Sequence, residues 1–116
     1  MGVLRIKNLL LRSYVGFKPH ELGKRQDVLL NIRIEYRSGN EETSDKPDDA
    51  MDYRGITKEI IEKVENSQFK LLEALTREVL DVVMTHERVL AAEVEIDKLH
   101  ALRFAESVSI CLSAKK

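Results

Sequence analysis

The chain of 116 residues contains no tryptophan, and aromatic residues make up only 5% of it. Proteins that bind single-stranded nucleic acid commonly stack bases on exposed aromatic rings, which are scarce in this sequence. The formal net charge of −1 provides no overall attraction to phosphate backbones or to anionic membrane surfaces. We therefore expect no nucleic-acid partner and no membrane partner.

Cysteine is nearly absent as well. Cys111 has no second cysteine with which to form an internal disulfide. The histidines at positions 20, 86 and 100 do not have the spacing of metal ligands, and no cysteine pair accompanies them. We expect no metal site.

Long hydrophobic runs are missing too. No stretch approaches the roughly 20 apolar residues that span a bilayer, and the first residues lack the apolar core of a signal peptide. Hydrophobic residues make up 43% of the chain and charged residues 34%, which is typical of a globular protein. We expect a single domain over residues 1–116, and a cytoplasmic enzyme or binding protein.

Alternation of apolar and polar residues predicts four strands. The clearest pattern covers residues 26–36, where every second side chain is apolar. A less regular pattern before it ends at Gly16, so the first two strands should form an antiparallel hairpin. The three other strands are predicted at residues 3–15, 94–98 and 107–112.

Helical spacing takes over between the two strand pairs. Residues 53–64 and residues 67–86 each present one apolar face, and the second face covers about 120° of the helical wheel. Ser67 is expected to cap the second helix. Residues 37–52 are polar and acidic, and should form a surface loop that is the only candidate for local disorder. The second apolar face comprises Leu71, Leu72, Leu75, Val79, Val82 and Val83.

The resulting β-β-α-α-β-β order predicts an α+β fold. Two helices can cover one face of a four-stranded antiparallel sheet, but they leave the other face and both edges open. Exposed edges are usually paired or protected, and joining sheets across subunits into a closed ring removes them. We therefore expect a homo-oligomer.

Lys98 lies at the end of a predicted strand. Because side chains alternate between the faces of a sheet, Lys98 continues the apolar row of Val94 and Ile96. A lysine beside apolar surface can serve as a proton carrier. Alternatively, its stem covers apolar surface while its ammonium group reaches water.

Several motifs, taken in order, resemble the dihydroneopterin aldolase family, and the resemblance covers essentially the whole chain. The run Lys98-Leu99-His100-Ala101-Leu102-Arg103, followed by Ala105-Glu106-Ser107-Val108, is similar to the branch that epimerises dihydroneopterin triphosphate at C2′. The other motifs are Glu21, Asp52-Tyr53, Phe69-x-Leu71-Leu72-Glu73 and Val94-Glu95-Ile96-Asp97-Lys98.

This resemblance implies a tunnelling fold (T-fold), in which four subunits close a barrel and two such rings usually stack into an octamer. It also implies pterin pockets between neighbouring subunits and a reaction without a metal or other cofactor. Glu73 and the backbone of Leu72 would anchor the pterin, with Glu21 near the substrate. Lys98 would transfer protons, and Tyr53 would come from the adjoining subunit and place a hydroxyl at the reacting carbons.

Simpler readings exist for each of these residues. Glu73 can form an ordinary exposed ion pair with Arg77, four residues later. Tyr53 can simply cover the first helix, and Glu21 can be a solvated turn residue.

The segment after Lys98 separates the epimerase branch from the aldolases. Aldolases of this family commonly have a proline after the lysine, whereas this chain has Leu99. His100 and Arg103 are the candidate contacts for the triphosphate because they follow Lys98 directly. Both can equally be solvated turn residues or subunit contacts.

We therefore expect an enzyme that epimerises 7,8-dihydroneopterin 3′-triphosphate at C2′. The alternative is a dihydroneopterin aldolase that releases 6-hydroxymethyl-7,8-dihydropterin and glycolaldehyde in folate biosynthesis. A ring protein that binds a pterin or purine without turning it over is the non-enzyme alternative. The zinc-dependent pterin enzymes that share the fold are disfavoured because their metal ligands are missing.

Overall fold

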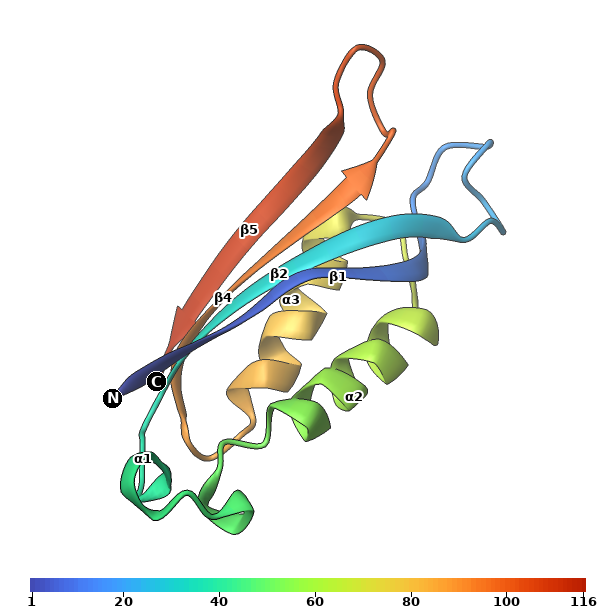
Figure 1. The fold of residues 1–116 in the computed structure, drawn as a ribbon. Coiled ribbons are helices and arrows are strands. Elements are labelled where there is room, and N and C mark those ends of the chain that lie inside the picture. Colours follow the sequence, from blue (N-terminus) through green and yellow to red (C-terminus); the bar gives the residue numbers. More distant parts are fainter.

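The structure is a computed structural model that describes all 116 residues. It has an α+β fold in which two long helices pack on one face of a curled sheet (Figure 1). The long strands are β1 (Gly2–Val15), β2 (Gln26–Tyr36), β4 (Val89–Leu99) and β5 (Ser107–Lys115), and the long helices are α2 (Tyr53–Glu65) and α3 (Leu72–Met84).

The sheet has the strand order β3-β1-β2-β4-β5. The predicted antiparallel pairing of the four long strands is confirmed. The prediction of a purely antiparallel sheet of four strands is wrong, because β3 (Gln68–Phe69) adds a short fifth strand parallel to the end of β1. Two residues are too few to show alternation, so this pairing depends on contacts that only the folded chain makes.

The core lies between the sheet and the two helices. The apolar row of β2 is fully or almost fully buried from Val28 to Ile34, and Val94 and Ile96 of β4 lie beside it. Helical side chains from Ile56 to Val83 cover these rows. The alternation in the strands and the helical spacing therefore supply two matching apolar surfaces.

Helix α2 begins at Tyr53, as the sequence predicts. The side chain of Asp52 caps this end by accepting a hydrogen bond of 3.0 Å from the backbone of Gly55. The expected start of the second helix at Ser67 is wrong. The hydroxyl of Ser67 donates to the carbonyl of Val64 at 3.3 Å, and α3 begins only at Leu72. Leu71, which was predicted on the buried face, is therefore half exposed.

The segment 37–52 is more regular than the loop that the sequence predicts. It contains a short helix α1 (Glu41–Ser44) and a 3-10 turn η1 (Pro47–Asp49). Arg88 holds both in place: its guanidinium donates to the carboxylate of Glu41 at 2.7 and 2.9 Å and to the carbonyl of Asp49 at 3.1 Å. The backbone of Gly39 and the cation of Arg88 lower the pKa of Glu41 despite partial burial.

Two strand edges remain open in the single chain. The outer side of β5 has no partner, and β3 covers β1 only at Tyr14 and Val15. Val3 and Leu10 on β1 are exposed apolar residues. None of the helices has the length and apolar character that crossing a membrane requires.

Ser13 is the one buried side chain whose polar atom has no partner in the chain. The residue is fully buried on β1, and its hydroxyl makes no hydrogen bond. We expect Ser13→Ala to raise the free energy of unfolding by about 1–3 kcal/mol, the usual cost of burying an unpaired polar group. Chemical denaturation checks this, with the exposed Ser113→Ala as a neutral control. Equal or lower stability of Ser13→Ala would mean that the hydroxyl is paired.

Candidate active site

A buried ion pair lies at the end of the sheet. Lys98 ends the inward row of β4, and its Nζ donates to the carboxylate of Glu21 in the loop between β1 and β2. Only 12% of the Lys98 side chain and 10% of the Glu21 side chain is exposed. The simpler readings of a lysine that reaches water and of a solvated glutamate are therefore wrong.

Glu21 is held from two further sides. Its Oε1 accepts a weak hydrogen bond of 3.3 Å from the backbone of Lys18. Gly16 lets the carboxylate approach the main chain, because a Cβ at this position would lie 2.6 Å from the carboxyl carbon. Gly16 also has a φ of 144°, which side chains disfavour. Only glycine satisfies both constraints.

Opposing effects act on the ionisation of Glu21. Burial raises its pKa, whereas the hydrogen bond from Lys98, the backbone N–H of Lys18 and the charge of Lys98 lower it. The lowering effects outweigh that of burial, so the pKa of Glu21 lies below its ordinary value of 4.5. The carboxylate is therefore ionised at neutral pH.

A pocket of about 240 Å³ opens beside this carboxylate. It forms where the end of β1, the loop that follows and β3 meet. A ligand site commonly has about 300–1,000 Å³, so the pocket of one chain is small. Its lining comprises Tyr14, Val15, Gly16, Glu21, Leu22, Gly23, Gln68, Phe69 and Lys70.

Leu72 and Glu73 follow directly from the pocket-lining segment. Leu71 occupies the N-cap position of α3 and makes no capping hydrogen bond, so the first backbone N–H groups of the helix lack a side-chain acceptor. Glu73 is exposed and forms no ion pair in the chain. The alternative of a Glu73–Arg77 pair is wrong, because Arg77 pairs with Asp81 at 3.0 Å.

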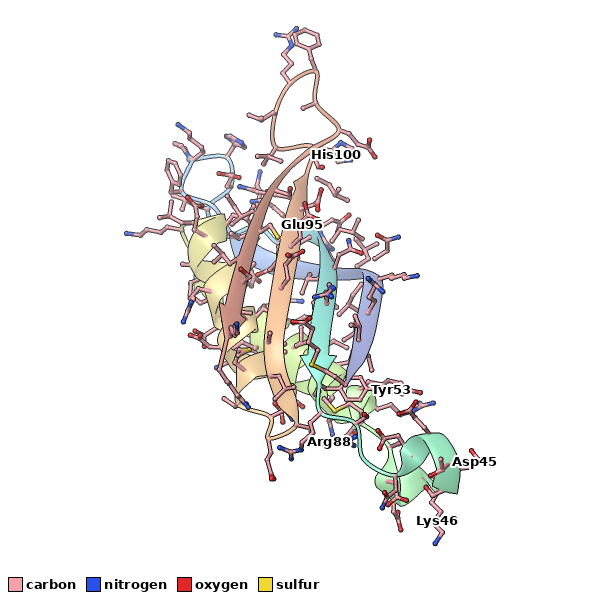
Figure 2. All side chains as sticks on the ribbon, turned by 90° about the vertical axis from the view of Figure 1, so that its left-hand side faces the viewer. Asp45, Lys46, Tyr53, Arg88, Glu95 and His100 are labelled. Carbon is pink, nitrogen blue, oxygen red and sulfur yellow. The ribbon has the colours of Figure 1, made fainter.

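Tyr53 lies far from Lys98 in the single chain. It is 48% exposed at the first turn of α2. Figure 2 shows it at the opposite end of the sheet from His100, which follows Lys98 by two residues. Tyr53 lines a second, widely open surface pocket of about 560 Å³, together with Arg54, Thr57, Lys58, Ile61 and Glu62.

His100 and Arg103 lie on the hairpin between β4 and β5. His100 takes a left-handed conformation with φ 59°, and its backbone donates to Glu106 at 3.3 Å. The guanidinium of Arg103 lies 5.1 Å from the ring centroid of Phe104, which is 96% exposed. Neither residue contacts the Lys98–Glu21 pair through a hydrogen bond. The chain has no group of three or more histidine, cysteine, aspartate or glutamate side chains that could hold a metal ion.

The sequence profile of dihydroneopterin aldolase matches residues 4–113. The chain belongs to the dihydroneopterin aldolase family. The dihydroneopterin triphosphate 2′-epimerase of Escherichia coli K12 is 52% identical over 112 residues, which cover 97% of this chain and 93% of that protein. The enzyme of the same name from Pseudomonas aeruginosa is 47% identical, with coverage of 100% and 94%. The predicted family and the predicted similarity to its epimerase branch are thus confirmed.

Solved structures show the same fold at low sequence identity. A putative dihydroneopterin aldolase from Vibrio cholerae superposes with a TM-score of 0.93 at 23% identity, covering 100% of this chain and 98% of that one. The Escherichia coli dihydroneopterin aldolase, solved in complex with neopterin, gives 0.91 at 20% identity, with coverage of 98% and 99%. The α+β architecture is therefore that of the family.

The sequence missed the direct contact between Glu21 and Lys98. These residues were predicted as separate members of a site, because they are 77 positions apart in the chain. Gly16 is predicted only as a break in the first strand. The one feature of the sequence that could have indicated the position of Glu21 is a glycine followed within a few residues by an acidic turn residue. This pattern is common in loops and therefore not specific.

The lowered pKa of Glu21 makes a pH-dependent prediction. A group whose pKa is lower in the folded state stabilises the fold above its unfolded pKa, and this contribution is lost as the pH falls through the folded pKa. Glu21→Gln should therefore be less stable than the wild type at pH 7. The difference should shrink progressively below pH 4.5.

Denaturation at a series of pH values measures this difference. Glu87→Gln is the matched control, because the Glu87 carboxylate is 91% exposed in a loose pair with Arg37. A difference in stability between Glu21→Gln and the wild type that stays constant down to acid pH would contradict the ion pair.

Proposed function

We propose that this protein epimerises 7,8-dihydroneopterin 3′-triphosphate at C2′, giving 7,8-dihydromonapterin 3′-triphosphate. The observation that carries the proposal is the identity of 47–52% to proteins named dihydroneopterin triphosphate 2′-epimerase over nearly the whole chain. The burial of Lys98 beside Glu21 supports a proton-transfer role for Lys98.

The substrate brings its own electron acceptor. In 7,8-dihydroneopterin the C6=N5 imine lies next to C1′, so it can take up the electrons that are released when the C1′–C2′ bond breaks. The protein then needs to supply positioning and proton transfer. This chemistry requires neither a Schiff base on Lys98 nor a metal.

The steps balance as a retro-aldol and aldol sequence. Lys98 first gives its ammonium proton to water, and the neutral amine, directly or through a water, then takes the proton from the 2′-hydroxyl. The C2′–O bond becomes a carbonyl as C1′–C2′ breaks, and the protonated amine passes the proton to N5, which has taken up the electrons. The products held in the site are the enol of 6-hydroxymethyl-7,8-dihydropterin and a glycolaldehyde fragment that carries the triphosphate. The fragment turns, the enol adds to its opposite face, and Lys98 carries the proton from N5 back to the 2′-oxygen.

The other predicted residues bind the pterin and steer its intermediate. The carboxylate of Glu73 accepts hydrogen bonds from the adjacent N–H groups of the aminopyrimidinone edge, a strong charge-assisted contact. The uncapped start of α3 leaves the backbone N–H of Leu72 available to the ring. Related aldolase structures contain neopterin or guanine, which share this edge. Glu21 orients Lys98, and the hydroxyl of Tyr53 acts at the reacting carbons.

The site is completed between subunits of a T-fold ring. The open edges of β1 and β5 can join neighbouring sheets, and four copies would close a barrel. The small pocket of one chain and the distant position of Tyr53 support a site that needs a second subunit. Two such rings stacked together would form an octamer.

Dihydroneopterin aldolase activity is the second candidate, because the family profile carries that name. Both reactions share the cleavage of C1′–C2′. Protonation of the enol before the fragment re-adds gives the aldolase products. Leu99, in place of the proline common in aldolases, favours the epimerase.

Product analysis tests this assignment. The protein is incubated with 7,8-dihydroneopterin and, separately, with its 3′-triphosphate, and the products are separated by chromatography. We expect the dihydromonapterin triphosphate as the main product from the triphosphate. Release of 6-hydroxymethyl-7,8-dihydropterin as the main product would instead identify an aldolase, and unchanged substrates would favour a binding protein.

Removal of the proton carrier should abolish most activity. We expect Lys98→Ala to lower kcat by about 10²–10⁴-fold, the usual contribution of a positioned acid or base. The exposed Lys46→Ala, between α1 and η1 and away from the sheet, is the control and should retain full activity. Near-normal turnover by Lys98→Ala would overturn the role of Lys98.

Mixed oligomers test whether the site is shared. Lys98→Ala and Tyr53→Phe chains should each have low activity alone. When they are co-expressed, about one interface in four should combine an intact Lys98 with an intact Tyr53 if the chains assemble at random. Recovery of about a quarter of wild-type activity is the expected result. No recovery in verified mixed oligomers would mean that both residues act within one chain.

A further inference from the structure

Two cations on α2 have no carboxylate partner in the chain. The other basic residues of the two long helices are paired: Lys63 contacts Glu78 at 3.1 Å, and Arg77 contacts Asp81 at 3.0 Å. Arg54 and Lys58 form no ion pair, although they lie four residues apart on one face of the helix. Like charges at this spacing destabilise a helix slightly, so an anion bound between them would relieve their repulsion.

These cations share a pocket with Tyr53. The guanidinium carbon of Arg54 lies 5.8 Å from the ring centroid of Tyr53, and Lys58 lines the same pocket of about 560 Å³. Nearby carboxylates belong to Asp52, which caps the helix, and to Glu62, one turn beyond Lys58. The lining of the pocket thus carries two cations, Arg54 and Lys58, and one carboxylate, Glu62.

In the proposed mechanism the phosphates of the substrate lie close to Tyr53. The triphosphate is attached at C3′, one carbon from the C2′ centre at which the Tyr53 hydroxyl acts in the proposed mechanism. We infer that Arg54 and Lys58, delivered with Tyr53 by the adjoining subunit, bind the triphosphate and set the preference for it over the free triol. This inference rests on the proposed function. Arginine can donate two parallel hydrogen bonds to a phosphate, and lysine adds a compact positive charge.

Other basic residues are less suited to this role. Arg103 stacks on Phe104, the most exposed large apolar side chain, whereas Arg54 stacks on Tyr53 itself. Lys70 lines the small pocket together with the anionic Glu21. His100 and Arg103 would form a second wall around the phosphates, and Arg54 and Lys58 would supply the main attraction.

The test is the ratio of kcat/KM for the triphosphate to kcat/KM for free dihydroneopterin. Each charge-assisted contact is worth about tenfold or more, so Arg54→Ala combined with Lys58→Ala should lower this ratio by about 100-fold. Lys63→Ala removes a paired cation from the same helix and should leave the ratio unchanged. The exchange Arg54→Lys with Lys58→Arg keeps both charges and should retain most of the preference.

Salt provides an independent readout in the same assays. Added salt should reduce the wild-type ratio, because screening weakens the attraction of the phosphates, and the double alanine variant should lose most of this dependence. If the alanine variant does not assemble, Arg54→Gln with Lys58→Gln replaces it.

The outcomes separate this inference from the proposed function. A wild-type enzyme that does not convert the triphosphate refutes the proposed function itself. If the wild type converts the triphosphate and the double variant changes the kcat/KM ratio by less than about threefold, only the role of Arg54 and Lys58 is refuted. A large decrease of the kcat/KM ratio in His100→Ala combined with Arg103→Ala would then show that the hairpin between β4 and β5 binds the phosphates.

Discussion

The buried ion pair between Lys98 and Glu21 is the contact on which the site depends. It joins the end of β4 to the loop after β1 across 77 positions of the chain. Either charge alone would be costly in this setting, because a buried charge without a partner destabilises a fold strongly. The pair therefore keeps an ammonium group beside the pocket and fixes the loop that forms one of its walls. Gly16 permits this arrangement, since any larger residue would collide with the carboxylate.

In the proposed site, proton transfer and substrate preference depend on residues at opposite ends of the sheet. One chain brings Lys98, its carboxylate partner Glu21 and the start of α3 together near one end of the sheet. Tyr53, Arg54 and Lys58 lie together on α2 and line one pocket, and Tyr53 lies at the other end of the sheet. In this account the pterin is bound mainly by one subunit and the triphosphate mainly by the next. Changes on the first turns of α2 can then alter substrate preference while the reaction stays the same.

The regular parts of the fold could be predicted because burial imposes a period on the sequence. The alternation of residues 26–36 identified β2, and Val94, Ile96 and Lys98 were correctly placed on one face of β4. Features created by tertiary contacts could not be predicted. The short β3 pairs only because it lies beside β1, and this pairing delays α3 and exposes Leu71. The order in segment 37–52 depends on Arg88, far along the chain. The resemblance to a family named the site residues, but no local pattern could reveal that Glu21 contacts Lys98.

In the proposed reaction no proton leaves a carbon atom while the C1′–C2′ bond breaks and re-forms. Epimerisation of dihydroneopterin triphosphate in deuterium oxide tests it, with the product analysed by mass spectrometry and proton NMR. In a retro-aldol route the hydrogen on C2′ stays on the aldehyde carbon throughout, so the epimer should contain no deuterium at C2′. Incorporation of one deuterium at C2′ in the epimer would contradict the account, because it would mean that the C–H bond is broken instead.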